Sequence, residues 1–224
     1  MNYRYLDLLA ALCVCDNASL HRNQNHIAEN LFLSGNGAIV KEVFLITDLG
    51  QNIGRRKNVV YISWDKGICW QTLHDFTTQS MGTDYYLFLQ YQLKLFASIA
   101  AGRNGYVVEV LTERLKVITW EECYICLTDR KLSDEIRALY CRLLYDLFIN
   151  VGTNFVTQDE KLVYLYDEVQ SVKDRQQNMN IGSNTVRAIP LPFMDPLKLW
   201  INDFLLENDS MVASEVGRNG LISE

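Results

Sequence analysis

Two cysteine pairs are the residues whose spacing comes closest to a reactive or metal-binding motif. Cys123-Tyr-Ile-Cys126 has the Cys-x-x-Cys spacing of redox-active dithiols and of half a zinc site. A zinc site needs a second ligand pair, and Cys13 and Cys15 do not have the usual zinc spacing. Both pairs lie in leucine-rich segments that we expect to be helical, where free cysteine behaves as a small hydrophobic residue. We therefore predict core positions and no metal or cofactor.

One short loop carries the only basic cluster, Gly54-Arg-Arg-Lys57. Arginine presents a fork of hydrogen-bond donors that suits phosphate and carboxylate groups. Arg55, Arg56 and Lys57 are therefore candidates for an anion contact. The alternative, which we favour, is a solvated loop, because three charges in one flexible segment seldom build a specific pocket.

The remaining polar residues do not form a catalytic pattern. His21, His26 and His74 have no partner at the spacing of a triad or a metal site, and His21 and His26 are too far apart for one helix face. The acidic pair Glu121-Glu122 stands at an expected helix start, where the helix dipole favours negative charge. We see no nucleophile with a base and predict that the chain is not an enzyme.

Three tryptophans are candidates for contacts with other domains. Trp64, Trp70 and Trp200 do not fit the apolar spacing of a helix core, and tryptophan is enriched among residues that anchor interfaces. Ordinary burial within this chain is the alternative for all three.

Composition limits the classes of protein to consider. The chain has 224 residues, of which 49% are hydrophobic, with only 3 prolines and 12 glycines, a scarcity that suits helices better than many tight turns. Its net charge of −6 argues against nucleic acid as a partner. Neither a membrane-spanning run of 18 apolar residues nor a signal peptide is present in the sequence. Six cysteines without a scaffold pattern indicate a reducing compartment.

Apolar periodicity predicts a mostly helical chain. In the first helix the expected buried stripe consists of Tyr5, Leu8, Leu9, Leu12 and Cys13. The expected helices are 3–15, 23–32, 85–101 with Asp84 as N-cap and Tyr85 on the buried face, 106–117, 119–127 and a last strong one from the N-cap Ser133 to about 147, while 38–49 is a further apolar segment and 163–169 is a helix or a strand.

Between these helices we expect a small β-hairpin, with strands at 59–64 and 68–70, and then a connection at 71–84 with one helical turn at most. The fold class is therefore all-α, an armadillo-like helical solenoid with a β-hairpin insertion. The predicted organisation is a helical domain at 3–172, a linker at 173–190, an additional helix at 191–206 that starts at the N-cap Asp195 with Pro196, and a flexible tail at 207–224.

Five phrases of the sequence resemble the cytosolic RIH helical domain shared by inositol trisphosphate receptors and ryanodine receptors. Their order and spacing agree with that family over about residues 3–172, and the third and fourth are closer to the inositol trisphosphate receptor branch. The phrases are Tyr5-Leu-Asp-Leu-Leu to Cys15 with Asn23-Gln24, Val60 to Asp65, Tyr91-Gln-Leu-Lys-Leu-Phe-Ala97, Leu132-Ser-Asp-Glu-Ile-Arg-Ala to Leu143, and Val156-Thr157 with Tyr164 to Tyr166.

The resemblance implies a segment of an intracellular ligand-gated calcium-release channel, on the cytosolic face of the endoplasmic reticulum. Its partners would be other domains and subunits of that channel, and its role would be to couple ligand binding to pore gating. None of the family's ligand-binding Arg and Lys residues maps onto this segment. A free-standing helical-repeat adaptor for protein–protein interaction is the alternative.

Overall fold

A computed structural model describes residues 2–16, 18–33, 43–151 and 194–207, and the chain divides into two compact units, Met1–Ser171 and Val172–Glu224. The described part is predominantly helical with two small sheets, so the prediction of a helical class with a β insertion is confirmed. The armadillo-like order of repeats stays a prediction.

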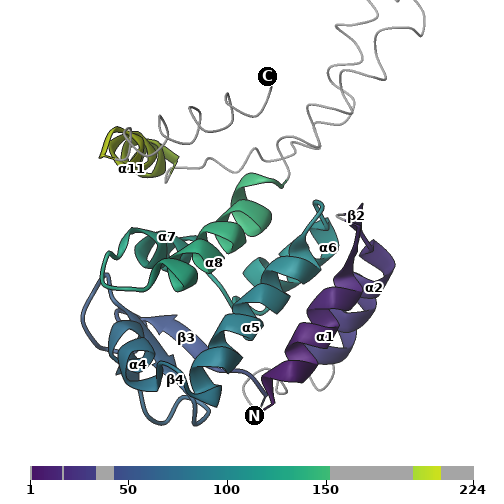
Figure 1. Cartoon of the computed structure of the whole chain (residues 1–224), viewed down its shortest axis with the longest axis horizontal. Coiled ribbons are helices and arrows are strands. Elements are labelled where there is room, and N and C mark those ends of the chain that lie inside the picture. Colours follow the sequence, from purple (N-terminus) through teal and green to yellow (C-terminus); the bar gives the residue numbers. More distant parts are fainter. Residues whose placement is uncertain (1, 17, 34–42, 152–193, 208–224) are drawn as a thin grey trace, which may run out of the picture. The chain divides into compact units, whose positions relative to one another are not determined.

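The described part of the first unit begins with helices α1 and α2 and continues through α8 to the π-helical turn η4 (Figure 1). In the part of this unit that the structure describes, five helices are capped by a side-chain oxygen that accepts a backbone N–H, among them α8, whose cap is Ser133 as predicted. The described helices of the first unit are α1 (Tyr3–Cys13), α2 (His21–Ala28), α4 (Leu73–Ser80), α5 (Asp84–Ala100), α6 (Gly105–Glu109), α7 (Trp120–Thr128) and α8 (Asp134–Leu144). Three described π-helical turns accompany them: η1 (Glu29–Leu33), η3 (Val110–Arg114) and η4 (Tyr145–Ile149).

Helix α5 is the centre of this unit. It contacts α1, α2, α4, α6 and α8, and α7 packs against α8 (Figure 1). Its sequence is apolar nearly all round, which is typical of a helix buried on several sides. Leu89, Leu93 and Phe96 are buried as predicted, whereas Tyr85 is exposed. The N-cap is Thr83, and Asp84 is the first helical residue.

The predicted hairpin around Gly67 is confirmed, with its second strand at 71–72 instead of 68–70, but the sheet has a third strand that was not predicted. Strand β4 (Val60–Ser63) pairs on one side with β3 (Ile46–Leu49) and on the other with β5 (Gln71–Thr72), both antiparallel. The first pairing closes a loop from Gly50 to Val59, a separation that local turn signals did not indicate. A second sheet, β1 (Val14–Cys15) with β2 (Ala18–Ser19), ends the first helix two residues earlier than predicted.

The segment predicted as a connection at 71–84 contains the two-turn helix α4. Thr72 caps it by accepting from the backbone N–H of Asp75. Leu73 and Phe76 are buried, and the helix contacts β4 and α5. Burial of these two side chains stabilises a helix of eight residues that carries no other large apolar side chain.

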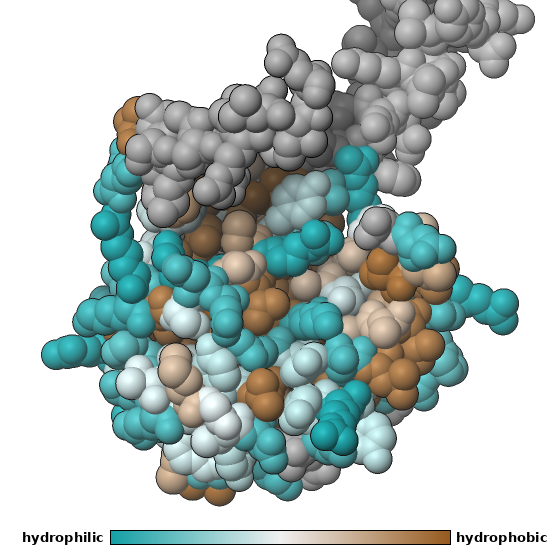
Figure 2. Space-filling view, in the orientation of Figure 1, coloured by the Kyte–Doolittle hydropathy of each residue, from teal (hydrophilic) through white to brown (hydrophobic). Residues whose placement is uncertain are grey.

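The predicted buried stripe of α1 is also wrong. Tyr5, Leu8 and Leu12 are 67%, 58% and 47% exposed, whereas Leu6 and Ala10 are buried together with Cys13, the one predicted position that proves to be buried. The buried face packs on α5. Alanine at position 10 lets the two helix backbones approach closely, and the larger apolar side chains therefore lie on the outer face. Figure 2 shows apolar side chains on the side of the molecule where α1 lies.

In the second unit the structure describes one helix, α11 (Met194–Glu207), at the place predicted for an additional helix. It begins one residue before Asp195, which therefore lies in the first turn and is not the N-cap. The predicted linker at 173–190, the element at 163–169, the tail beyond Glu207 and residues 38–42 of the third apolar segment lie outside the described residues.

Candidate functional site

The predicted anion-binding residues lie in the exposed loop between β3 and β4. This loop folds back on itself, because the backbone N–H of Arg55 donates to the carbonyl of Gly50 at 2.6 Å. The Arg55 guanidinium lies over the Tyr61 ring, 5.4 Å from its centroid. Arg56 and Lys57 are exposed. Anion contact by these three residues stays a prediction.

Trp70 closes the turn between β4 and β5. Its indole N–H donates to the carbonyl of Gly67 at 2.9 Å. The Asp65 carboxylate accepts from the Ser63 hydroxyl and from the backbone N–H of Cys69, both at 2.7 Å. These bonds lower the pKa of Asp65 to about 2, because they favour its charged form. Trp70 therefore has a local role, and its docking role stays a prediction.

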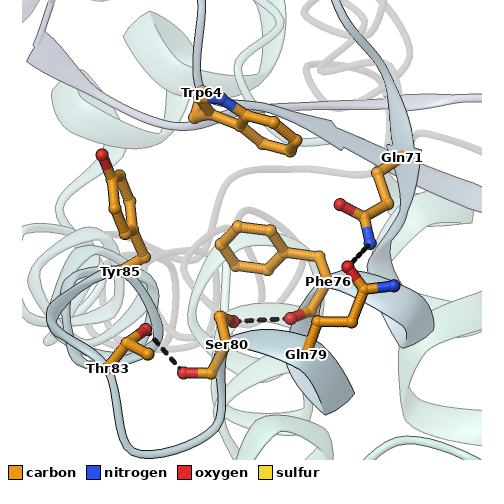
Figure 3. Close-up of a pocket in the computed structure, with 7 residues that line it drawn as sticks. All are labelled: Trp64, Gln71, Phe76, Gln79, Ser80, Thr83 and Tyr85. Atoms are coloured by element: carbon orange, nitrogen blue, oxygen red, sulfur yellow. Dashed lines mark hydrogen bonds between the residues drawn. The ribbon is translucent and has the colours of Figure 1, made fainter.

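Trp64 lines a pocket of about 310 Å³ at the end of β4. Its ring stacks on Phe76 of α4, with centroids 6.0 Å apart and planes inclined by 26°. Trp64 is 42% exposed and Tyr85, on another wall, is 51% exposed. Figure 3 shows the two rings on adjacent sides of the opening and Phe76 below them. The other lining residues are Gln71, Gln79, Ser80 and Thr83.

Of the three predicted tryptophans, Trp64 and Trp70 flank the same turn, but only Trp64 lines the pocket. Trp200 lies on α11 in the second unit, where its ring stacks on Phe204 at 5.3 Å. Sequence reasoning missed Phe76 because α4 was not predicted, and it placed Tyr85 on the buried face of α5. The signal available for Tyr85 was its position in the first turn, where a helix face often extends beyond its packing partner.

A second group of interest is buried between α7, α8 and β3. Glu122 on α7 is fully buried, and burial raises the pKa of its carboxyl to about 7. Tyr140 on α8 donates to its Oε1 at 3.4 Å, and the Thr47 side chain on β3 forms a hydrogen bond with it. The sequence correctly predicted that Glu122 lies at a helix N-terminus, but it did not predict that this residue is buried.

Cys123 and Cys126 lie beside Glu122 and are buried, as is Cys13, which agrees with the prediction of core positions; for Cys15, which is exposed in β1, the prediction is wrong. Desolvation raises the pKa of both thiols well above the ordinary value, so neither is an activated thiolate. Over the described ranges, no three His, Cys, Asp or Glu side chains are grouped so that they could hold a metal ion. The same residues contain no helix long and apolar enough to cross a membrane.

Two buried glutamines in the segments that resemble the RIH domain form hydrogen bonds between different elements of the fold. Gln24 on α2 donates to the carbonyls of Ser98 and Ala101 at the end of α5, at 2.9 and 3.0 Å. Gln92 in the middle of α5 accepts from the backbone N–H of Leu45 at 2.9 Å and donates to its carbonyl at 2.8 Å. Both glutamines are buried, so these bonds fix positions of backbone segments that are far apart in the sequence.

Arg137, in the fourth phrase, has a similar position. Its Nε donates to the Leu127 carbonyl near the end of α7 at 3.0 Å, and its Nη1 lies 2.9 Å from an oxygen of Asp134. The arginine therefore links the two antiparallel helices α7 and α8 at their connection.

A scan against protein-family models matches residues 1–48 with the RIH domain. This is the domain of inositol trisphosphate receptors and ryanodine receptors that the phrases resemble, so the resemblance is confirmed over this segment. The matched residues contain α1, α2 and the start of β3. They pack against α5 and are therefore integral to the first unit.

Proposed function

We propose that this chain is a cytosolic helical scaffold segment of an intracellular ligand-gated calcium-release channel. The observation that carries the proposal is the match of residues 1–48 with the RIH domain. The remaining phrases, which extend to about residue 172, add to it. In the cell the segment lies on the cytosolic face of the endoplasmic reticulum membrane, and its partners are other domains and subunits of the same channel.

The outer face of α1 supports a scaffold role. Tyr5, Leu8 and Leu12 form an exposed apolar stripe along one side of this helix, and we call these three residues the α1 stripe. Contiguous exposed apolar side chains in a folded protein often mark a contact with another protein surface. Neighbouring channel domains are the partners that the family match favours.

The proposed mechanism is mechanical coupling. α1 and α2 are attached to α5 by apolar packing and by the bonds of Gln24. α5 is attached to the sheet by Gln92 and to α8 by direct packing. A displacement imposed on α1 by a ligand-bound neighbour is therefore transmitted through packed elements, the kind of rigid-body motion that allosteric proteins use.

Two experiments test this function. Sequencing the full transcript should show a reading frame that continues into membrane-spanning helices. A frame that stops near Glu224 would overturn the channel and would favour the adaptor.

The second experiment uses the full-length channel, with ligand-evoked calcium release as the measurement. Leu8→Glu combined with Leu12→Glu should reduce release while ligand affinity stays unchanged, because charges on the α1 stripe oppose its burial against a neighbour. Ile68→Glu is the matched control, since Ile68 is 80% exposed in the β4–β5 turn. Unaltered release in the double variant would contradict the coupling role.

A further inference from the structure

The pocket beside Trp64 has three aromatic walls. Trp64 comes from the end of β4, Phe76 from α4 and Tyr85 from the first turn of α5. Phe76 is buried and holds the Trp64 ring in place by stacking at 6.0 Å. The faces of aromatic rings carry partial negative charge and attract cations, with tryptophan the strongest. The volume, about 310 Å³, is at the small end of known ligand pockets and suits one side chain.

The polar rim of this pocket presents mostly acceptors. The Ser80 hydroxyl donates its hydrogen to the Phe76 carbonyl at 2.5 Å, and the Thr83 hydroxyl donates to the Ser80 carbonyl at 2.6 Å. A hydroxyl has one hydrogen to donate but two lone pairs, so both oxygens offer acceptor sites to a ligand. Gln71 uses its Nε2 to donate to Gln79 Oε1 at 2.9 Å, and Figure 3 shows its carbonyl oxygen turned toward the Trp64 and Phe76 rings.

Two carboxylates adjoin lining residues in the sequence, although neither lines the pocket and Lys66 follows one of them. All seven lining residues are uncharged. Asp84 stands between the lining residues Thr83 and Tyr85 and is exposed, and Asp65 directly follows Trp64. The hydrogen bonds that hold Asp65 lower its pKa, so its carboxylate stays charged at neutral pH. A cation beside these residues gains an attraction that a neutral or anionic group does not.

We propose that this pocket binds an arginine side chain presented by an exposed segment of a partner protein. Guanidinium has five donors in a plane and no acceptor, which matches a rim of acceptors. It stacks on aromatic rings, and it is less strongly hydrated than an ammonium group, so desolvation costs less than for lysine. Proline and aliphatic side chains would use the rings but not the acceptors or the carboxylates. The site does not depend on the proposed channel function.

The test uses the pentapeptide acetyl-Gly-Gly-Arg-Gly-Gly-amide as the probe and the whole chain as the protein. The indole N–H signals of the four tryptophans are followed by NMR during titration, with Trp64→Phe to assign the signal of interest. We expect the Trp64 signal to shift with a dissociation constant on the order of a millimolar, as for one anchored side chain. The Trp120 signal should not move, because Trp120 is buried against Phe148.

A citrulline peptide is the decisive comparison, because citrulline has nearly the shape of arginine and no charge. It should bind at least about fivefold more weakly. A proline peptide should bind more weakly still. Equal affinity for citrulline or proline, or no shift with the arginine peptide, would overturn the proposal; a preference for proline would instead identify a groove for neutral peptides.

Several variants locate the site, so the conclusion does not depend on one substitution. Trp64→Leu should abolish the arginine-dependent shifts of the backbone amide signals of the other lining residues, Ser80 and Thr83 among them. Tyr85→Leu changes an exposed residue and should weaken binding by roughly three- to tenfold. Asp84→Asn should weaken binding by roughly two- to threefold at low salt and less at high salt. Trp200→Ala, on α11, is the control and should leave binding unchanged. Unchanged binding in Tyr85→Leu would contradict the assignment.

Discussion

Glu122 should make the stability of this protein fall as the pH rises through neutrality. Its carboxyl is fully buried, and burial raises the pKa from the usual 4.5 to about 7. The nearby negative charge of Asp48 acts in the same direction, while the bonds from Thr47 and Tyr140 oppose it without cancelling it. Cys123 and Cys126, also close by, are neutral thiols in the interior.

The sign follows from linkage between protonation and folding. Below the unfolded pKa the carboxyl is protonated in both states, so burial costs no charge. Between the two pKa values the unfolded chain is ionised while folded Glu122 keeps its proton, and the free energy of unfolding declines with each pH unit. The decline ends above the folded pKa. One unit is worth about 1.4 kcal/mol, so the total loss is about 3 kcal/mol between pH 4.5 and 8.

Glu122→Gln should remove most of this dependence. Glutamine has nearly the size of a protonated glutamate and keeps a carbonyl oxygen that accepts from Tyr140. At pH 5 the variant should unfold within about 1 kcal/mol of the natural protein, and at pH 8 it should be more stable by about 2–3 kcal/mol. Urea unfolding at half-unit pH intervals measures both curves.

Two features of the urea experiment separate the effect of Glu122 from that of other carboxyl groups. Glu121→Gln removes the same charge one position away on the exposed side of α7 and should change the free energy of unfolding by no more than about 0.5 kcal/mol. The buried carboxyl of Asp146, whose pKa is also raised by burial, contributes equally to all three proteins and cancels. Parallel curves for Glu122→Gln and the natural protein between pH 5 and 8 would refute the reasoning.

Three further changes test the contacts of the first unit by urea unfolding at one pH. Gln92→Leu should destabilise by about 2–4 kcal/mol, because it leaves the buried N–H and C=O of Leu45 without their bonds; a loss below about 1 kcal/mol would show that these bonds contribute little. Gly102→Ala should lower the free energy of unfolding more than Gly82→Ala does. Both glycines have φ near +80° (+76° and +79°), but a Cβ at Gly102 would meet the Ser19 hydroxyl at 2.3 Å, whereas Gly82 faces open space. Gly82→Ala, the control, should lose only about 1–2 kcal/mol, and equal losses in the two variants would contradict the steric argument. Leu8→Ala should change the free energy of unfolding by less than about 0.5 kcal/mol, because the side chain is exposed, whereas a loss of 2 kcal/mol would place it in the core.

Two helices of the first unit that are rich in apolar residues were predictable from the sequence. α5 and α8 each carry a run of apolar residues at helical spacing, and α8 begins after Ser133, whose capping role is visible from its type and position. The core positions Leu89 and Leu143 followed from the same periodicity. Burial in α8 repeats with the helical period and α5 is apolar on nearly every side, so the local sequence of each helix contains the information.

Pairing between distant segments was not predictable in this way. β3 pairs with β4 across the loop that contains Gly50, and no local signal indicated this partner, whereas the β4–β5 hairpin around Gly67 was predictable from its turn residues. α4 is short and has only two large apolar side chains, Leu73 and Phe76, whose packing on other elements stabilises it. Three of the residues that line the pocket come from α4, so its walls could not be assembled from sequence alone.

The prediction chose the wrong face of α1 as the buried one, and the reason is physical. The sequence of this helix offers two stripes, one with large apolar residues and one with Leu6, Ala10 and Cys13. Hydrophobicity alone favours the first, but close approach to α5 favours the second, because small residues allow backbones to come near and fill the space. Large side chains then remain outside on the α1 stripe. A helix with two apolar faces is expected when both are covered in the native assembly. The choice of the smaller face for the interior is therefore itself an argument that the larger one contacts a neighbour.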